Sequence, residues 1–178
     1  RIYEPAGDAW TLATTLFASD AVAGDRFATT LDLEGNRLPV GPPVKRVVPG
    51  GLSGAAYVFR QDGGTWVEEF ATGHHTPPGI LLGSSVDLEG SLLVAGAQAY
   101  DTSEPNAGAV FTWHRSGTAW TPAGQFLASD GAGGDMLGTV VIASGPMVAA
   151  SSPNDQSVPG FGVHGSAYSF DTLPPGWR

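Results

Sequence analysis

Two pairs of aspartates are the residues best placed for metal chemistry. Asp20 and Asp25 lie five residues apart in a glycine-rich stretch, and Asp130 and Asp135 repeat that spacing. Carboxylates held in one loop can converge on a hard cation such as Ca²⁺, which takes several oxygen ligands. Two carboxylates are few for such a site, and aspartates next to glycine often accept hydrogen bonds from loop amides instead. The pattern predicts hydrogen-bonded loops, with calcium at these four residues as the alternative.

Other chemistry-bearing residues form no recognisable catalytic set. His74, His75 and His164 fall in expected loops, but no cysteine or well-spaced carboxylate completes a metal site beside them. The sequence has no Gly-x-Ser-x-Gly elbow, His-Glu-x-x-His helix or phosphate-binding loop. Asp62-Gly-Gly-Thr-Trp66 only approximates a sialidase Asp box. We therefore predict no catalytic residue, no bound cofactor and a protein that is not an enzyme.

A few side chains are candidates for contact with a partner. Tyr100 and Phe161 are aromatic residues in expected long loops, outside the repeated positions described below. Lys45 and Arg46 form the only adjacent basic pair, inside the apolar segment from Pro43 to Pro49. Such a segment could dock a protein, or it could pack on its own chain. These four residues are the predicted partner-binding positions.

Composition narrows the class of partner. The 178 residues carry a net charge of −9 and no cysteine. No cationic stripe is present to replace the counterions of a phosphate backbone, so we expect no nucleic acid partner. No apolar run reaches the 18 or so residues of a membrane-spanning helix. The absence of cysteine excludes disulfides and thiolate chemistry without fixing a compartment.

The elements that must position these residues recur at a fixed period. Four of the five tryptophans recur at positions 10, 66, 120 and 177, at spacings of 56, 54 and 57. Each interval ends in a glycine-opened alternating segment: Gly54–Phe59, Gly108–Trp113 and Gly165–Phe170. Each unit offers four short runs of strand character, which in the first unit are 27–32, 37–40, 54–60 and 66–70. The chain is therefore a repeat array of all-β units.

Four-stranded antiparallel units at this period are typical of β-propeller blades. A β-sandwich or a parallel β-solenoid is the alternative, but a sandwich would not repeat tryptophan and closing strand so regularly, and a solenoid coil usually has a shorter period. We predict one propeller segment over 1–178, with repeats at about 10–65, 66–119 and 120–176 and the end of a preceding repeat at 1–9. About three blades are expected. The repeated aromatics should pack between blades: Trp10, Trp66, Trp120, Tyr57, Phe59, Phe111 and Tyr168.

Strand direction sorts the loops onto two ends of such units. The long connections, expected at 17–27, 71–81, 127–137, 41–53, 96–106 and 151–164, should all lie at one end. Tight turns should occupy the other end. Binding residues tend to lie on long loops carried by a rigid scaffold, so the long-loop face is the predicted recognition surface.

These residues resemble the FG-GAP repeat, the unit of integrin alpha-chain propellers and of many secreted or surface bacterial proteins. The resemblance is carried by Phe17-Ala-Ser-Asp20 with Gly24-Asp-Arg-Phe27, by Leu127-Ala-Ser-Asp130 with Gly134–Gly138, and by Val40-Gly-Pro-Pro43. The second unit departs, because residues 71–82 hold no aspartate. The resemblance implies a non-catalytic scaffold for adhesion or for binding a protein or carbohydrate, located outside the cytoplasm.

Three further expectations concern calcium, an alternative function and the two ends of the chain. Integrin-type propellers bind calcium in an Asp-rich hairpin between the first two strands, but Asp32–Asn36 and Asp87–Ser91 hold fewer ligands than that motif. An alternative function is the propeller part of a secreted hydrolase whose catalytic residues lie elsewhere. The chain opens on an expected third strand and stops near an expected fourth at Trp177, which predicts either further blades or self-association to cover the terminal faces.

Overall fold

The computed structural model describes residues 1–47, 51–72, 78–157, 160 and 162–172. Within these ranges the regular elements are fifteen β-strands, and no helix occurs. The prediction of an all-β fold is confirmed. The same ranges contain no helix with the length and hydropathy required to span a membrane.

Antiparallel pairing groups most of the strands into three larger sheets. The first, in the order β3-β4-β7-β8, consists of β3 (Thr30–Leu31), β4 (Arg37–Gly41), β7 (Tyr57–Asp62) and β8 (Thr65–Ala71). The second, in the order β12-β11-β10-β9, consists of β9 (Leu82–Glu89), β10 (Leu92–Ala97), β11 (Ala109–Ser116) and β12 (Ala119–Phe126). The third, in the order β13-β14-β15, consists of β13 (Val141–Ser144), β14 (Met147–Ser152) and β15 (Ser166–Asp171).

Two hairpins complete the described structure. β1 (Ile2–Ala6) pairs with β2 (Ala9–Thr14), and β5 (Arg46–Val47) pairs with β6 (Gly51–Leu52). Since β2 opens the first sequence repeat but pairs with β1, each repeat runs from the last strand of one sheet into the first three strands of the next.

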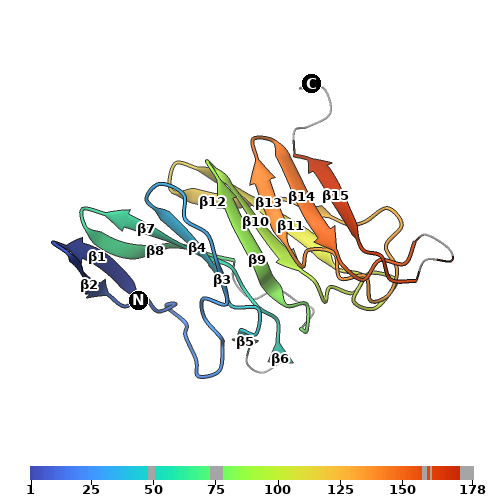
Figure 1. Cartoon of the computed structure of the whole chain (residues 1–178), viewed down its shortest axis with the longest axis horizontal. Helices are drawn as coiled ribbons and strands as arrows, with labels where there is room; N and C mark the ends of the chain where they lie inside the picture. Colours follow the sequence, from blue (N-terminus) through green and yellow to red (C-terminus); the bar gives the residue numbers. More distant parts are fainter. Residues whose placement is uncertain (48–50, 73–77, 158–159, 161, 173–178) are drawn as a thin grey trace.

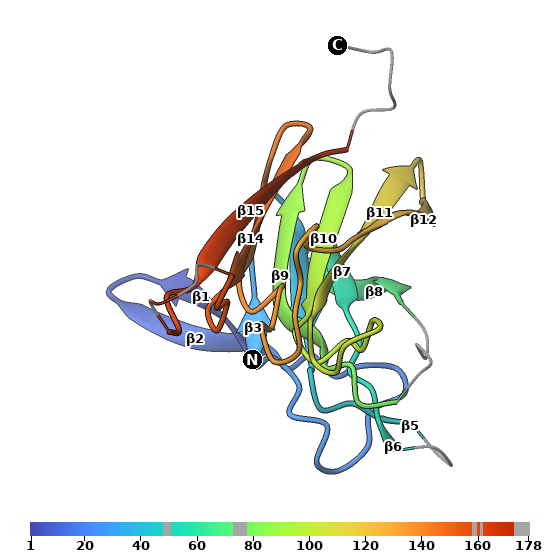
Figure 2. The same ribbon diagram turned by 90° about the vertical axis from the view of Figure 1, so that its right-hand side faces the viewer.

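The three larger sheets are stacked side by side (Figures 1 and 2). Strands β3 and β4 contact β9, and β9 and β10 contact β13, so the first strands of successive sheets lie next to one another. Strands β8 and β12 form the far edges of their sheets. This is the arrangement of successive propeller blades.

A repeated turn allows neighbouring sheets to approach closely. Leu81 and Met136 take positive φ, as do Gly83 and Gly138 two residues later, and Gly54 and Gly108 each bridge in parallel to the leucine in between. A Cβ at Gly83 would lie 2.2 Å from the carbonyl oxygen of Ala55, so the backbones meet where a side chain has no room. The small residues of the repeat are therefore needed at the sheet-to-sheet contact.

Apolar side chains fill the space between the sheets. One buried cluster joins the first sheet to the second through Val58, Leu82, Leu88, Leu93 and Trp113. The next joins the second sheet to the third through Val94, Val110, Leu137, Val141 and Val148. Each cluster combines residues of one sheet with residues of the following sheet, so a similar apolar pattern recurs from one repeat to the next.

The repeated tryptophans have different surroundings. Trp120 stacks on Phe70 of the preceding sheet with ring centroids 5.4 Å apart, and Trp66 packs against the cluster of the first sheet. Trp10, in contrast, is 70% exposed. Our expectation that Trp10 packs between blades is therefore wrong within the part of the chain that the structure describes. The hairpin β1-β2 that carries Trp10 makes its main contacts within itself. Trp177 lies outside the described residues.

Two local predictions differ from the structure. The strand expected at 27–32 is reduced to Thr30–Leu31, because Arg26 and Ala28 adopt positive φ and the chain is still turning there. The segment from Pro43 to Pro49 contributes Arg46–Val47 to the small hairpin β5-β6, where only a loop was expected.

Candidate binding face

The long connections gather at one end of the sheets, at the bottom of Figure 1, and the hairpin turns lie at the other end. This follows from antiparallel strand order, because every second connection must return to the same end. The aspartates identified from the sequence belong to the long-loop end. We call this end the long-loop face.

In the first unit, Asp25 is buried and fully engaged by its own loops. Its carboxylate accepts the N–H of Val22 at 2.8 Å, the N–H of Arg46 at 2.9 Å and the ammonium of Lys45 at 2.8 Å. Burial alone would raise the pKa of Asp25, but these three donors lower it below its usual value. Asp25 therefore stays ionised and joins the loop before β3 to the segment after β4.

Asp20 completes the same cluster from the loop surface. Its Oδ1 accepts the hydroxyl of Tyr57 at 2.7 Å and lies 3.1 Å from the ammonium of Lys45, which also donates to the Asp20 carbonyl oxygen. Burial opposes ionisation of Asp20, while Tyr57 and Lys45 lower its pKa. The ammonium of Lys45 thus occupies the position between the two aspartates where a metal cation was the alternative prediction.

The third unit has the same kind of aspartate loop as the first, but a different residue takes the position of Lys45. Asp135 accepts the N–H of Ala132 at 2.7 Å, as Asp25 does from Val22, and Tyr168 donates to Asp130 at 2.8 Å, as Tyr57 does to Asp20. The residue at the repeat position of Lys45 is Asp155, whose Oδ2 also lies 3.0 Å from the Tyr168 hydroxyl. A carboxylate therefore stands where the first unit has an ammonium.

Asp155 is buried, and hydrogen bonds keep it ionised. The hydroxyl of Ser166 lowers its pKa most, and Ser157 and Tyr168 add to this effect, so that the pKa is about 2 despite burial. The N–H of Ser157 donates to its Oδ1 at 2.6 Å. Burial and the two aspartates raise the pKa of Tyr168 above its usual value, so its hydroxyl stays protonated and can donate.

Sequence reasoning found Asp20, Asp25, Asp130 and Asp135 but missed Lys45 as their partner, Asp155 and the two tyrosines. One signal was available in the repeats. The units with an aspartate pair have tyrosine at the third position after the strand-opening glycine, Tyr57 and Tyr168, whereas the second unit has Phe111 there and no pair. Loss of the acceptor is matched by loss of the hydroxyl.

No group of three or more His, Cys, Asp or Glu side chains among the described residues is arranged to hold a metal ion. In the first unit the chain supplies its own cation through Lys45. A calcium ion at Asp130 and Asp135 stays a prediction.

The acidic hairpins between first and second strands join neighbouring sheets. Asp32 accepts the N–H of Leu88 at 3.2 Å, and Asp87 makes the equivalent bond to the N–H of Ala143 in the following sheet. Glu34 likewise accepts the N–H of Gly90 at 2.8 Å. Burial, then the neighbouring charge of Asp32, raise the pKa of Asp87 against the opposing bond from Ala143. These acids act as contacts between sheets.

The predicted partner-binding residues differ in their burial and in whether the structure describes them. Lys45 is buried and paired inside the chain, so of the basic pair only Arg46 is exposed. Tyr100 is half-buried, with its ring 5.5 Å from that of Phe111 in an edge contact. Phe161 lies outside the described residues, as do His74 and His75. His164 is exposed, with Nδ1 3.1 Å from the carbonyl oxygen of Gly165.

A polar hollow of about 240 Å³ opens on the long-loop face between the second and third units. Its walls include Thr102 and Ser103 on one side and Ser129 on the other. The two loops are tied together by bonds from the N–H of Gly134 to the Pro105 carbonyl oxygen, at 2.9 Å, and from the N–H of Met136 to that of Asn106, at 3.1 Å. The hollow therefore has backbone-braced walls and hydroxyl groups in its lining.

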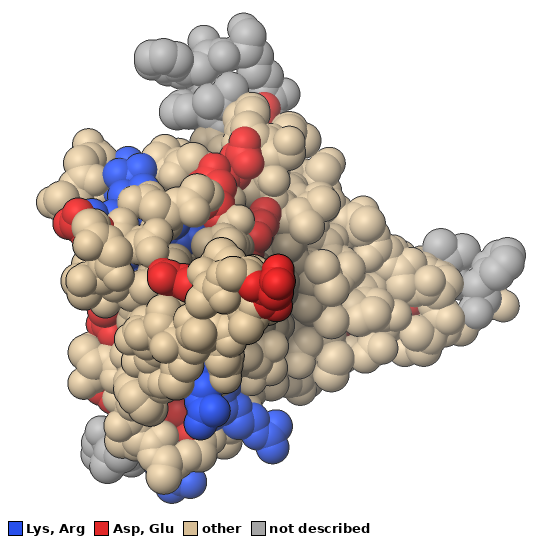
Figure 3. Space-filling model, turned by 60° about the vertical axis from the view of Figure 1, so that its left-hand side comes forward, with Lys and Arg blue, Asp and Glu red and all other residues tan. Residues whose placement is uncertain are grey.

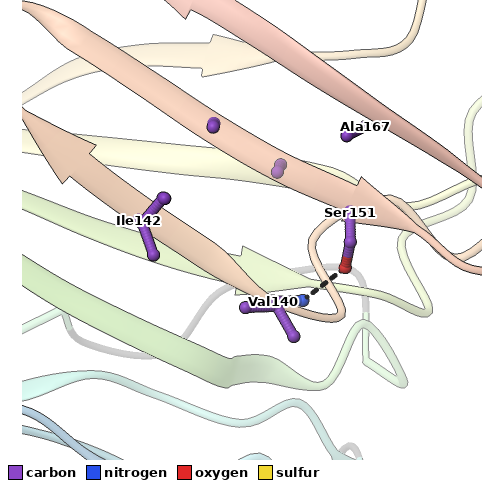
Figure 4. A pocket seen from close by; sticks show the side chains of 6 residues that line it. Val140, Ile142, Ser151 and Ala167 are labelled. Atoms are coloured by element: carbon purple, nitrogen blue, oxygen red, sulfur yellow. Dashed lines mark hydrogen bonds between the residues drawn. The ribbon is translucent and has the colours of Figure 1, made fainter.

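A second hollow, of about 190 Å³, lies on the open face of the third sheet (Figure 4). Val140 and Ile142 project beside Ser151 and Ala167, and the N–H of Val140 donates to the Ser151 hydroxyl at 3.0 Å. On the second sheet the equivalent face is covered by the third sheet. This hollow belongs to the packing surface between sheets, apart from the long-loop face.

Comparison with known families agrees with this geometry. Residues 10–59, which run from Trp10 through the aspartate loop to Phe59 in β7, match the model of the FG-GAP repeat. Over this segment, less than half of the 178 residues, the chain is similar to an FG-GAP repeat. No curated protein matches it significantly. FG-GAP repeats are typical of extracellular and surface proteins, and they support a propeller-type binding scaffold in general terms.

Proposed function

We propose that this chain is a non-catalytic adhesion or binding module that takes its ligand on the long-loop face and works outside the cytoplasm. The hollow between residues 102–108 and 127–131 is the observation that carries the proposal. The FG-GAP repeat supports both the scaffold role and the extracytoplasmic location.

The lining of this hollow favours a ligand that exchanges hydrogen bonds with hydroxyl groups, such as a sugar residue of a glycan. Ser129 and Ser103 offer hydroxyls, while Leu127, Ala128 and Ala107 supply small apolar surface. Sites that bind small ligands commonly combine apolar walls with a few placed polar groups. The bracing of Gly134 and Met136 by the opposite loop reduces the ordering needed on binding.

A glycoside hydrolase of the usual kind would need two carboxylates free to reach the same substrate. Asp155 is buried and committed to Ser157 and Tyr168, and Asp25 to Lys45 and two backbone N–H groups, which supports the non-catalytic role.

The proposal is tested by screening the chain on a glycan array and measuring the affinity of any hit by calorimetry. Ser129→Trp should fill the hollow and weaken binding at least about tenfold, because the ligand loses its space. Ser116→Trp, the same change at an exposed hairpin turn, is the matched control. Binding that survives Ser129→Trp unchanged, or a chain that captures only proteins and no glycan, would contradict the glycan proposal.

A further inference from the structure

Three arginines converge on one glutamate near the hairpin-turn end, away from the long-loop face. Glu69 of β8 is reached by the Nε atoms of Arg37 at 3.1 Å, of Arg60 at 3.2 Å and of Arg115 at 3.8 Å. The indole N–H of Trp120 donates to the same carboxylate at 3.2 Å. We call Arg37, Arg60, Arg115 and Glu69 the arginine cluster.

The arginine cluster carries an excess of positive charge in an acidic protein. Three guanidiniums face one buried carboxylate, and Arg60 also pairs with the exposed Asp62, so the formal excess is one positive charge in a chain whose net charge is −9. Three of the eight basic residues of the chain are gathered here. Figure 3 shows basic side chains with acidic side chains beside them toward the upper, turn end of the molecule, and a second basic group at the lower end.

The glutamate does not satisfy all of its partners. The Nε atom of Arg115 is buried without a hydrogen-bond acceptor among the described residues, because Glu69 lies beyond bonding distance from it. The arginine side chains keep 19, 28 and 22% of their surface exposed, for Arg37, Arg60 and Arg115, while Glu69 keeps 7%. The exposed surface of the cluster thus belongs mainly to the arginine side chains, one Nη atom of each having a partner in Asn36, Asp62 or the Gly117 carbonyl oxygen.

The repeat does not require this arrangement. Leu92 and Met147 take the place of Arg37 in the second and third units. At the outer edge between the second and third sheets, Phe126 stacks on Phe170 with ring centroids 4.9 Å apart. Between the first and second sheets, the stack of Phe70 and Trp120 already provides such a contact. The arginines are therefore an addition to the packing that joins the sheets.

We propose that the arginine cluster binds a doubly charged oxyanion, a sulfate or phosphate group. The planar fork of a guanidinium matches the oxygens of such groups, and several arginines around one anion are the usual way proteins hold them. Asp62, whose side chain is 65% exposed, pairs with Arg60 at 3.0 Å and occupies part of the site in the absence of the ligand.

The test is an NMR titration of the ¹H–¹⁵N signals of the arginine Nε groups at constant ionic strength, with inorganic sulfate and inorganic phosphate as probes and chloride as the reference. Saturable shifts of the Arg37, Arg60 and Arg115 signals are expected with the two dianions. Shifts that do not saturate, or that chloride reproduces, would overturn the proposal. Glucose 6-sulfate and glucose 6-phosphate in parallel show whether the group is preferred free or as part of a larger ligand.

Variants separate binding from structural support. Arg60→Gln should weaken binding about tenfold, since it removes a charge-assisted contact. Arg46→Gln, which removes one positive charge from the opposite end, should leave the affinity unchanged. Asp62→Asn should tighten binding about threefold by removing a competitor for Arg60. If Arg60→Gln fails to fold, Asp62→Asn still decides, because unchanged affinity there contradicts the site.

Discussion

At the scale of single residues, the long-loop face depends on a buried ammonium. Lys45 satisfies Asp20 and Asp25 together, and both aspartates hold the loop that leads into the first sheet. Removing one member of a buried ion pair leaves an uncompensated charge, which costs far more than the intact pair contributes.

Lys45→Met is therefore expected to lower the free energy of unfolding by about 3 kcal/mol, measured by urea denaturation at pH 7. Arg46→Met, at the neighbouring exposed position, should change it by less than about 0.5 kcal/mol. Equal effects of the two variants would show that the ammonium of Lys45 has no special role.

The carboxylate of Asp155 makes the stability of the fold depend on pH. Because its pKa of about 2 lies below the ordinary value of 3.8, the ionised carboxylate stabilises the fold above pH 3.8, and this contribution is lost as the pH falls toward 2. Asp155→Asn should lower the free energy of unfolding by about 2 kcal/mol at pH 7.

Near pH 2 this deficit should almost vanish, as urea denaturation at the two pH values would show. Asp130→Asn, on the exposed partner of Tyr168, is the control and should have a small effect at both. A deficit for Asp155→Asn that is independent of pH would mean that the carboxylate is not the stabilising group.

At the scale of elements, the sheets meet through close backbone contacts as well as through the apolar side chains packed between them. Gly83 has a φ of 83°, and an added Cβ would lie 2.2 Å from the Ala55 carbonyl oxygen. The parallel bridge between Gly54 and Leu82 fixes the same approach.

Gly83→Ala should accordingly cost more than about 3 kcal/mol, since the first two sheets must separate to admit the methyl group. Gly90→Ala is matched in φ, at 60°, but has open space around it, so about 1 kcal/mol is expected. Thermal unfolding of both variants measures the difference. Similar losses would place the effect in the local backbone and not in the contact between sheets.

The strands also show which elements could be predicted from the sequence and which could not. The glycine-opened closing strands were predictable because alternation and glycine recur together, and they correspond to β7, β11 and β15. The hairpin β5-β6 was not, since Arg46–Val47 and Gly51–Leu52 occur once and have no repeat to support them. A repeated sequence pattern predicts the elements that all units share, but it cannot predict an element that occurs in one unit alone.

Recurrence between repeats also explains which residues of the candidate site could be predicted from the sequence. The aspartate pairs were visible because they recur, and their role as acceptors of loop amides was inferred from the glycine beside them. Lys45 was predicted to contact a partner, because it belongs to a basic pair in an apolar segment that could dock a protein. Its burial depends on the fold of β4 and β7 bringing it to Asp25, a contact 20 residues away in sequence that no local pattern encodes.

At the scale of the whole molecule, apolar surface is open at both ends of the stack. Trp10 is 70% exposed at one end, and Val140 and Ile142 are 54% and 59% exposed at the other. Since equivalent faces are buried between sheets inside the stack, water is an unfavourable neighbour for them.

We therefore predict that the 178-residue chain self-associates as its concentration rises, by sedimentation velocity. Ile142→Glu should shift the distribution toward monomer, whereas Ser116→Glu, at an exposed turn, should not. A chain that stays monomeric over a wide concentration range would show that the open faces are tolerated as they are.

The whole account depends on successive sheets being joined at equivalent points. The N–H of Leu82 donates to the Ser53 carbonyl oxygen at 3.0 Å, and one repeat later the N–H of Leu137 donates to that of Ala107 at 3.0 Å. NMR scalar couplings across these two hydrogen bonds are the most direct measurement. We expect both couplings to be present, together with slow hydrogen exchange at both amides. Absence of both, or coupling of either leucine amide to a different carbonyl, would contradict the stacked-sheet architecture.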